Sequence, residues 1–262
     1  MSIPKTVHYC WFGRNPKPKL AEKCIKSWKK YCPDYEIIEW NEENFDLSAC
    51  PVYVRQAYER KKWAFVTDYV RLKVVYEHGG IYLDTDVELK KPLDMLLPYS
   101  AYFGFEDDVH INTGLGFGAE KGHPLLNELM QDYEDISFVQ ADGALDVLPC
   151  PQRNAPVFLR HGLRPDNSRQ ILKDNILILP SEYLCPLSYL DGQKQLTENT
   201  ISVHWFGASW QSKAERDRHK ADIRKAKKAR CTHFLLHIPH RLLRSMLGDE
   251  RYEALKQKRK RR

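Results

Sequence analysis

The first forty residues alternate between mostly apolar runs and loop-forming residues. Residues 6–12 are followed by a glycine and a proline-containing loop, which predicts a buried strand. Apolar residues then recur at helical spacing over residues 20–31, and Pro33 follows the expected end of that helix. Residues 36–40 predict a second short strand. This order predicts a βαβ unit, although the glycine-rich fingerprint of ordinary NAD-binding units is absent.

The next segment contains a helical pattern followed by the clearest alternation in the chain. Residues 55–76 have mostly helical periodicity, and Gly79-Gly80 is a strong signal that the helix ends. From Ile81 to Leu89 the alternation predicts one strand, with Ile81, Leu83, Thr85, Val87 and Leu89 on one face. The other face would carry Tyr82, Asp84, Asp86 and Glu88.

Strands and helices continue to alternate along the rest of the chain. Further strands are predicted at residues 101–105, 111–117, 176–179 and 200–205. Residues 123–136 predict an amphipathic helix, whereas residues 141–169 are irregular and predict no defined element. After residue 210 the chain becomes basic and helical. The whole pattern predicts an α/β fold with a mixed sheet.

The charge distribution divides the chain into two parts. Residues 213–262 hold 18 Lys and Arg against 6 Asp and Glu, which leaves 23 against 29 for the first 212 residues. We therefore expect one main domain over residues 1–212 and a basic helical extension over residues 213–262. Such an extension favours an anionic partner, either lipid headgroups or nucleic acid.

The remaining composition is that of an ordinary globular protein. No apolar run is long enough to span a bilayer, and the first residues lack the apolar core of a secretory signal. The seven cysteines form no C-x-x-C pair and match no zinc-site spacing. We therefore expect reduced thiols and a cytoplasmic protein, with the option of peripheral attachment to the inner face of the plasma membrane.

Asp84 and Asp86 are the strongest chemical signal. Two carboxylates separated by one strand residue lie on one face, roughly 6–7 Å apart at their Cα atoms. Unpartnered carboxylates are costly to bury, so this face should line a polar cleft. Oxygen ligands suit Mg²⁺ or Mn²⁺, which would neutralise a diphosphate leaving group. The alternative is a solvent-exposed strand edge whose acidic residues prevent aggregation.

The residues around this pair resemble a known enzyme family. Ala64-Phe65-Val66-Thr67-Asp68-Tyr69-Val70-Arg71-Leu72, followed by Tyr76 and Gly79-Gly80-Ile81-Tyr82-Leu83-Asp84-Thr85-Asp86, resembles the signature of family 32 glycosyltransferases. These DXD-motif sugar transferases are related to initiating α-mannosyltransferases and distantly to large clostridial glucosylating toxins. The resemblance extends weakly over residues 3–210. It implies a GT-A fold with a Rossmann-like mixed sheet, a nucleotide-sugar donor, a divalent metal and retention of anomeric configuration.

The resemblance assigns roles to five residues of the signature. It implies that Asp84 reaches the donor and shares the metal site, and that Asp86 is the direct metal ligand. Asp68 and Arg71 match the pair that holds the donor sugar and phosphates. Asp84, Asp86 and Arg71 are counted as the catalytic residues. Their i, i+3 spacing puts them on one helical face, where a surface ion pair is the alternative. Tyr82 would line the same donor pocket.

Further donor contacts follow from the same resemblance. Trp11 follows the first strand, where related enzymes stack an aromatic ring on the nucleobase, although core packing explains it nearly as well. Asn112, after the acidic run Glu106-Asp107-Asp108, is the choice for a sugar contact, and a solvated loop is the simpler explanation of the three acids.

The segment from Ser202 to Trp210 resembles the closing element of related enzymes. It implies that His204 completes the metal site and that Trp210 contacts the donor diphosphate, with Ser209 and Ser212 as alternatives to Trp210. A lone histidine at a strand end is otherwise more often structural.

Together these residues predict a retaining, metal-dependent glycosyltransferase. It would move a hexose or N-acetylhexosamine from a UDP-sugar to a saccharide or lipid-linked saccharide, in the synthesis of surface polysaccharide or glycolipid. The basic extension could attach to an anionic membrane or simply lie solvated against the domain. Two other functions compete: a metal-dependent nucleotide-sugar phosphohydrolase, and nucleic-acid binding through the basic tail. No nucleic-acid partner is expected, because no recognised binding module is present.

Overall fold

The amino-terminal residues form the parallel βαβ unit that the sequence predicts. β1 (Thr6–Cys10) and β2 (Glu36–Trp40) pair in parallel, and α1 (Lys19–Tyr31) connects them. The helix buries its Ala21, Cys24 and Trp28 side chains, as its periodicity requires. β1 is two residues shorter than the predicted strand at 6–12, so Trp11 and Phe12 lie just after it.

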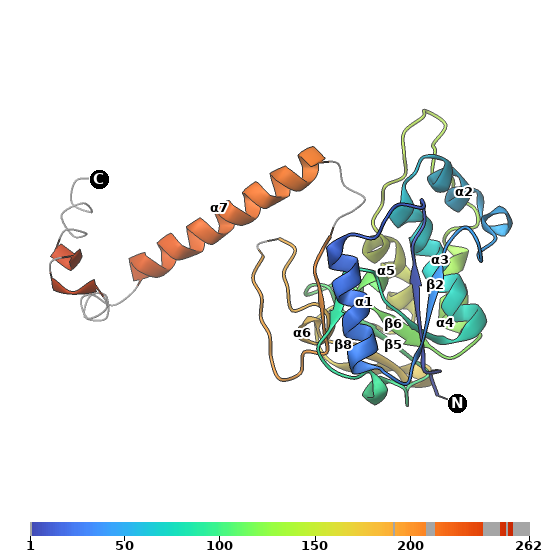
Figure 1. Ribbon diagram of the computed structural model, residues 1–262, viewed down its shortest axis with the longest axis horizontal. Helices are drawn as coiled ribbons and strands as arrows, with labels where there is room; N and C mark the ends of the chain where they lie inside the picture. Colours follow the sequence, from blue (N-terminus) through green and yellow to red (C-terminus); the bar gives the residue numbers. More distant parts are fainter. Residues whose placement is uncertain (1, 191, 208–212, 238–246, 250, 254–262) are drawn as a thin grey trace. The chain divides into compact units, whose positions relative to one another are not determined.

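A mixed sheet forms the centre of the described structure (Figure 1). Its seven strands lie in the order β2-β1-β3-β6-β5-β8-β7 among the residues that the structure describes. The strands not yet introduced are β3 (Gly80–Tyr82), β5 (Ala101–Gly104), β6 (Phe117–Ala119), β7 (Gln170–Leu172) and β8 (Ile176–Leu179). β6 is antiparallel to both of its neighbours, and β7 is antiparallel to β8. The expected mixed α/β sheet is therefore confirmed.

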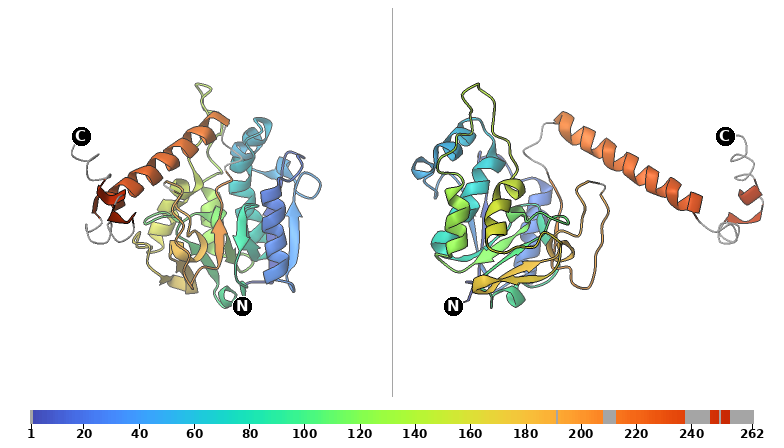
Figure 2. Two further views of the ribbon diagram at one scale, coloured as in Figure 1. Left: turned by 60° about the vertical axis from the view of Figure 1, so that its left-hand side comes forward. Right: turned by 180° about the vertical axis from the view of Figure 1, so that it is seen from behind.

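Helices cover one face of this sheet, and α1 with a small second sheet covers the other (Figure 2). The first layer consists of α2 (Val52–Glu59), α3 (Trp63–His78), α4 (Pro124–Gln131) and α5 (Cys150–Arg160). The second sheet pairs β4 (Val87–Leu89) with β9 (Ser202–His204), and the short helix α6 (Ser181–Leu184) precedes β9. Neighbouring residues of β3 show the two layers, since Ile81 joins one apolar core and Tyr82 the other.

The predicted continuous strand from Ile81 to Leu89 is wrong. The chain leaves the main sheet after Tyr82, and the Val87 N–H donates to the Asp84 carbonyl at 2.9 Å before β4 begins in the second sheet. Helices cover both faces of the main sheet, so two adjacent carboxylates inside it would be buried without enough polar partners. The turn instead places Asp84 and Asp86 at half-buried positions.

Two other boundaries differ from the prediction because of local backbone chemistry. The helical segment at 55–76 is divided into α2 and α3, because Lys61 takes a left-handed conformation with φ of 57°. The strand expected at 111–117 is wrong, because the Asn112 side chain accepts a 2.6 Å hydrogen bond from Gly114 N–H and caps a 3₁₀ turn, Thr113–Leu115, so that β6 begins only at Phe117. The predicted helix at 123–136 is also shorter, and α4 ends at Gln131.

One helix was missed in the proline-rich segment. α5 tolerates Pro151 because residues of the first helical turn need no backbone N–H donor. Pro156 lies inside the same helix, where proline normally argues against helix formation. Packing overrides this local preference, since α5 buries Cys150, Val157 and Phe158 against the core.

The structure describes residues 2–190, 192–207, 213–237, 247–249 and 251–253. The chain divides into two compact units, one of residues 1–189 with 193–211 and one of residues 190–192 with 212–262. The second unit contains α7 (Lys213–His237), whose described side chains are mostly exposed and rich in lysine and arginine. Among the described helices, none combines the length and the apolar composition that crossing a bilayer requires.

Candidate functional site

The turn between β3 and β4 carries the two aspartates of the Asp-x-Asp motif. The Leu83 N–H donates to the His8 carbonyl at 3.0 Å, which attaches the start of the turn to β1. The Asp86 carbonyl accepts a 3.0 Å hydrogen bond from Trp205 N–H, which attaches its end to the segment after β9. The turn is therefore held from two distant parts of the chain.

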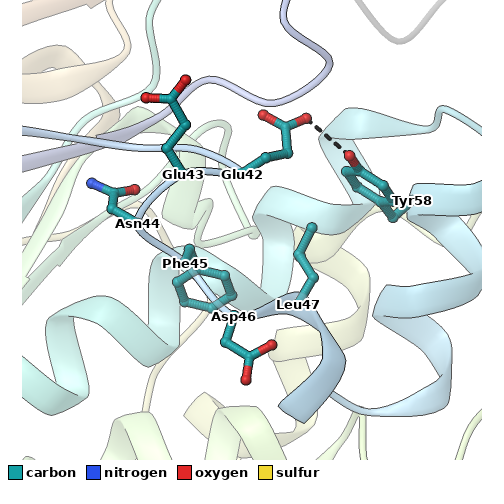
Figure 3. A pocket seen from close by; sticks show the side chains of 7 residues that line it. All are labelled: Glu42, Glu43, Asn44, Phe45, Asp46, Leu47 and Tyr58. Atoms are coloured by element: carbon teal, nitrogen blue, oxygen red, sulfur yellow. Dashed lines mark hydrogen bonds between the residues drawn. The ribbon is translucent and has the colours of Figure 1, made fainter.

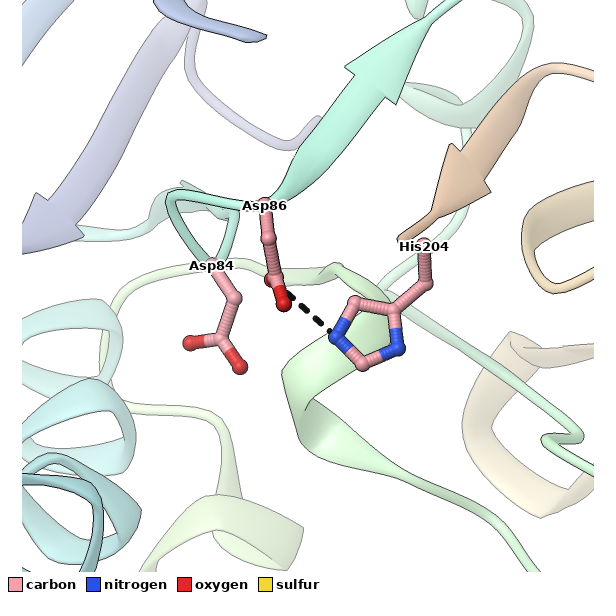
Figure 4. Close-up of side chains that lie close together, drawn as sticks. All are labelled: Asp84, Asp86 and His204. Carbon is pink, nitrogen blue, oxygen red and sulfur yellow. Dashed lines mark ion pairs between the residues drawn. The ribbon is translucent and has the colours of Figure 1, made fainter. Parts of the chain in front are cut away.

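His204 reaches this turn from the end of β9. It pairs with Val87 in the antiparallel β4–β9 register, and its Nε2 lies 3.1 Å from Asp86 Oδ1. One ligand atom from each of Asp84, Asp86 and His204 lies within 4.8 Å of the other two. Figure 4 shows the His204 ring and the Asp86 carboxylate pointing toward one another, with Asp84 beside them.

The charges of this cluster depend on one another. Burial alone would raise the pKa of Asp86, but His204 and the Gly207 N–H, which donates to Asp86 Oδ2 at 2.7 Å, hold it below its usual value. Burial also opposes protonation of His204, but the neighbouring Asp86 charge raises the pKa of that imidazole well above its usual value. Burial raises the pKa of Asp84, while Arg71 acts in the opposite direction.

Two glycines lie directly against the two carboxylates, where a larger residue would collide with them. A Cβ on Gly114 would lie 2.5 Å from Asp84 Oδ2, and one on Gly207 would lie 3.2 Å from Asp86 Oδ2. Two carboxylates and an imidazole are ligands that divalent cations accept, with carboxylate oxygen favouring Mg²⁺ and Mn²⁺. The three ligand side chains, with no Cβ at Gly114 or Gly207 to displace the carboxylates, therefore fit the predicted metal.

Asp68 and Arg71 lie on α3, directly behind this cluster. Arg71 Nη2 is 2.8 Å from Asp68 Oδ1 and 3.7 Å from Asp84 Oδ1, so the arginine faces both carboxylates. Asp68 is 7% exposed and Arg71 is 3% exposed, so the alternative of a surface ion pair is wrong. Burial raises the pKa of Asp68 to about 6, although the Arg71 charge opposes this rise.

Tyr82 joins the same network from the last position of β3. Its hydroxyl donates a 2.8 Å hydrogen bond to Asp84 Oδ1, and the Arg71 guanidinium carbon lies 5.3 Å from the centre of its ring. The structure thus brings together five residues that the sequence singled out, Asp68, Arg71, Tyr82, Asp84 and Asp86, with His204 completing the group.

Asn112 lies next to this network through its neighbour Gly114. The Asn112 carboxamide oxygen accepts from Gly114 N–H, and its amide group donates to Glu106. Glu106 is therefore engaged with Asn112, whereas Asp107 bonds His110, and Asp107 and Asp108 are exposed in the loop. A solvated loop accounts for Asp107 and Asp108 but not for Glu106.

Two further predicted donor contacts are Trp11 and Trp210. The half-buried Trp11 ring donates from Nε1 to the Asn15 carbonyl at 2.6 Å, and Lys17 Nζ lies 5.8 Å from its centre. Its proposed contact with a nucleobase stays a prediction. Trp210 and its alternatives Ser209 and Ser212 lie outside the described residues.

A separate hollow of about 570 Å³ lies beside α2 (Figure 3). It is lined by Glu42, Glu43, Asn44, Phe45, Asp46, Leu47 and Tyr58. Its three carboxylates would repel a diphosphate, and none of the six clustered residues lines it. We therefore place the functional site at the Asp84–Asp86 turn rather than in this hollow.

The sequence did not single out Gly114, Gly207, Glu88 or Trp205 as parts of the site. The Trp205 indole donates to Glu88 at 2.9 Å, and the two residues lie 117 positions apart in the chain. Such a contact leaves no local pattern. The glycines carried a weak signal, because glycine often marks a close approach of backbone and ligand.

The family comparison matches the part of the chain that contains the two aspartates. Residues 18–103 match the family described as "Glycosyltransferase sugar-binding region containing DXD motif". This region includes Asp68, Arg71, Tyr82, Asp84 and Asp86, so the resemblance to DXD-motif sugar transferases is confirmed for this region. His204 lies outside the matched residues.

Curated relatives and a solved structure agree with this match. The chain is 32% identical over 141 residues to inositol phosphoceramide mannosyltransferase 3 of Schizosaccharomyces pombe, covering 52% of this chain and 39% of the relative. It is 27% identical over 147 residues to inositol phosphoceramide mannosyltransferase 1 of the same organism, covering 50% and 42%. The chain thus spans well under half the length of these relatives.

The fold comparison supports the expected fold class. The solved structure of PaToxG Glycosyltransferase superposes with a TM-score of 0.50 at 20% sequence identity, covering 61% of this chain and 69% of that one. At this identity the likeness concerns the fold alone. It confirms a GT-A type of mixed sheet flanked by helices.

Proposed function

We propose that this chain transfers a sugar from a nucleotide-sugar donor. The proposal starts from the match of residues 18–103 to the DXD-containing sugar-binding region of glycosyltransferases. The observation that best supports this proposal is that one ligand atom from each of Asp84, Asp86 and His204 lies within 4.8 Å of the other two. The proposed product is a saccharide or glycolipid, made with retention of configuration. Residues 1–212 form the catalytic region of this proposal and residues 213–262 its basic extension.

Asp84, Asp86 and His204 would hold Mn²⁺ or Mg²⁺. When bound, the cation supplies positive charge for the diphosphate that leaves. Asp86 already has a fixed orientation, because its two oxygens face His204 and the Gly207 N–H. A preoriented ligand avoids reorganisation during the reaction.

Arg71 supplies a buried positive charge on the other side of Asp84. With its Nε it donates to the Thr67 carbonyl at 2.9 Å, which fixes the guanidinium on α3. The fixed guanidinium would stabilise developing negative charge on the donor, and Asp68 would accept hydrogen bonds from sugar hydroxyls. Tyr82 keeps the Asp84 carboxylate oriented through its 2.8 Å hydrogen bond.

Trp11, Asn112 and Trp210 are proposed as further donor contacts. The set of Trp11, Asp68, Arg71 and Tyr82 favours UDP as the nucleotide. The relatives are mannosyltransferases by name, so GDP is the alternative that an experiment must include.

The acceptor is proposed to be a saccharide or a lipid-linked saccharide. The names of the relatives, which act on inositol phosphoceramide, favour an acceptor with a lipid anchor. The basic extension would then bind an anionic membrane surface from the cytoplasmic side.

The first test is a thermal-shift titration with UDP and GDP, each with and without Mn²⁺. A ligand at about 100 times its dissociation constant stabilises the native state by about 2.7 kcal/mol. A Mn²⁺-dependent shift with one nucleotide identifies the donor class. The matched variant Asp86→Asn should lose the shift, whereas Asp107→Asn in the exposed loop should keep it. A full shift in Asp86→Asn would refute the metal assignment.

Transfer must also be separated from hydrolysis of the donor. A phosphohydrolase would use the same aspartates but would hydrolyse the donor diphosphate to a sugar phosphate and a nucleoside monophosphate, without an acceptor. We expect turnover to rise when a saccharide acceptor is added. Equal turnover with and without acceptors would favour the phosphohydrolase.

A further inference from the structure

The exposed side of α1 carries a row of lysines directly opposite its buried side. Lys19, Lys23, Lys26 and Lys30 are all exposed and are separated by four, three and four positions. At 3.6 residues per turn these positions fall within an arc of about 60°, and the row is about 16 Å long. Of the acidic residues, only Glu22 lies on this helix.

Two further lysines continue this row beyond the helix. Lys23 Nζ and Lys90 Nζ each lie 2.7 Å from a different oxygen of the Glu88 carboxylate. Lys194 Nζ lies 4.9 Å from the centre of the Trp205 ring, and that ring donates to Glu88. The Glu88 carboxylate thus pairs with two lysines, and the Trp205 ring that it holds contacts a third. We call Lys19, Lys23, Lys26, Lys30, Lys90 and Lys194 the lysine face.

This positive charge is not neutralised by ion pairs within the described part of the chain. Lys23 and Lys90 share the single charge of Glu88. Lys19, Lys26 and Lys30 form no ion pair with any described residue, although Lys30 lies 4.9 Å from the Tyr31 ring centre. Free positive charge along a straight row complements an anionic surface.

The lysine face begins beside the aspartate site. α1 is attached to β4 by two hydrogen bonds, from Trp28 Nε1 to the Val87 carbonyl at 2.8 Å and from Leu89 N–H to Ser27 Oγ at 2.9 Å. Leu20, next to Lys19, would come within 3.6 Å of a Cβ on Gly207, whose N–H bonds Asp86. A surface bound by this row would therefore lie next to the aspartate site.

We infer that the lysine face docks residues 1–212 onto an anionic lipid bilayer, in addition to any attachment through the basic extension. The face consists of lysines without arginine, and lysine is a hydrated point charge suited to diffuse attraction by many headgroups. Nucleic-acid sites rely more on arginine and on exposed aromatic rings for stacking. Docking would bring the aspartate site close to an acceptor anchored in the bilayer. This advantage rests on the proposed function.

The test measures binding of the full chain to phosphatidylcholine vesicles with and without phosphatidylserine, by co-sedimentation. The variant Lys19→Gln/Lys26→Gln/Lys30→Gln removes three charges and leaves the Glu88 cluster intact. Its control, Lys61→Gln/Lys121→Gln/Lys173→Gln, removes three exposed charges elsewhere on the same unit. Both variants keep the basic extension, and their melting temperatures report whether they fold.

We expect the first variant to bind phosphatidylserine vesicles at least about tenfold more weakly than the control variant, which should bind almost like the natural chain. Equal binding by the two folded variants would overturn the inference. So would unchanged vesicle binding with a selective loss of binding to a single-stranded RNA oligonucleotide, which would assign the face to nucleic acid. Vesicle binding needs no donor, so a chain that binds vesicles but transfers no sugar would refute the proposed function alone.

Discussion

A side-chain hydrogen bond between Trp205, directly after β9, and Glu88, on β4, connects the two strands of the small sheet beside the aspartate site. The indole Nε1–H of Trp205 donates to Glu88 Oε2 at 2.9 Å, while the backbone N–H of Trp205 bonds the Asp86 carbonyl. His204 directly precedes Trp205, so this pair sets the position of the imidazole against Asp86.

Trp205→Phe should therefore weaken metal binding without unfolding the protein. The phenyl ring keeps most of the apolar contact but cannot donate to Glu88, and a hydrogen bond to a charged group contributes about 1.5–3 kcal/mol. Loss of a group that orients a metal ligand typically lowers metal affinity about 10- to 100-fold. Calorimetric titration with Mn²⁺ checks this. Trp63→Phe, which alters a half-buried tryptophan against the other apolar core, should leave the affinity unchanged.

Asp68→Asn should impair donor use more than folding. The amide keeps the shape of the side chain but removes the charge that lies 2.8 Å from Arg71. Removing one partner of a buried ion pair costs about 3–5 kcal/mol, although Asp84 at 3.7 Å still opposes the Arg71 charge. We expect a lower melting temperature and a kcat/KM for the donor reduced by about 100-fold, measured below that temperature. A folded variant with unchanged donor kinetics would assign the pair a purely structural role.

Gly114→Ala should disable the site through a single methyl group. Its Cβ would lie 2.5 Å from Asp84 Oδ2 and 3.0 Å from Arg71 Nη1, so the Asp84 carboxylate would have to move. We expect loss of Mn²⁺ binding and of transfer, with circular dichroism unchanged. Gly143→Ala is the control, because a Cβ there meets no atom within 4 Å, although its φ of 83° adds backbone strain. Mn²⁺ binding retained by Gly114→Ala would contradict the placement of the site.

His8 should make the protein less stable as the pH falls below about 6.5. Its Nε2 bonds the Gly79 carbonyl at 2.8 Å and its Nδ1 accepts from Trp40 Nε1 at 3.1 Å, so a second ring proton would break the Trp40 bond. Burial, with a smaller contribution from the nearby His78, lowers its pKa from 6.5 to about 4, although the hydrogen bond to the Gly79 carbonyl opposes this shift. Between these two pKa values the His8 imidazole is therefore protonated in the unfolded chain and neutral in the folded chain.

Stability from His8 is thus fully present above pH 6.5 and is lost progressively down to about pH 4, by about 3 kcal/mol in total. Urea unfolding of the natural chain and of His8→Gln at several pH values checks this. The free energy of unfolding of His8→Gln should fall less over this pH range than that of the natural chain. All other titrating groups contribute equally in both proteins. Parallel pH profiles would contradict the prediction.

Local periodicity correctly predicted the elements whose neighbours lie close in sequence. The βαβ unit at residues 6–40 is the clearest example, because its strands and helix bury apolar stripes with the expected periods. Strand β8 was also predicted at its observed bounds, since all four of its residues are buried. The failures, by contrast, lie where distant contacts or particular side chains override the local pattern. α5 forms despite Pro156 because the core accepts its apolar side, and β6 is short because Asn112 caps the preceding turn.

The sequence by itself determined the α/β class, the basic extension and the residues that the site brings together, because each carries a local pattern or belongs to a short motif. Only the tertiary structure decided that Asp84 and Asp86 lie on a turn between two sheets, and that Asp68 and Arg71 are buried behind them. The same holds for the bond between Trp205 and Glu88, which joins residues 117 positions apart. The physical reason is that a buried charge is stable only beside particular partners, and those partners are chosen by packing across the whole chain.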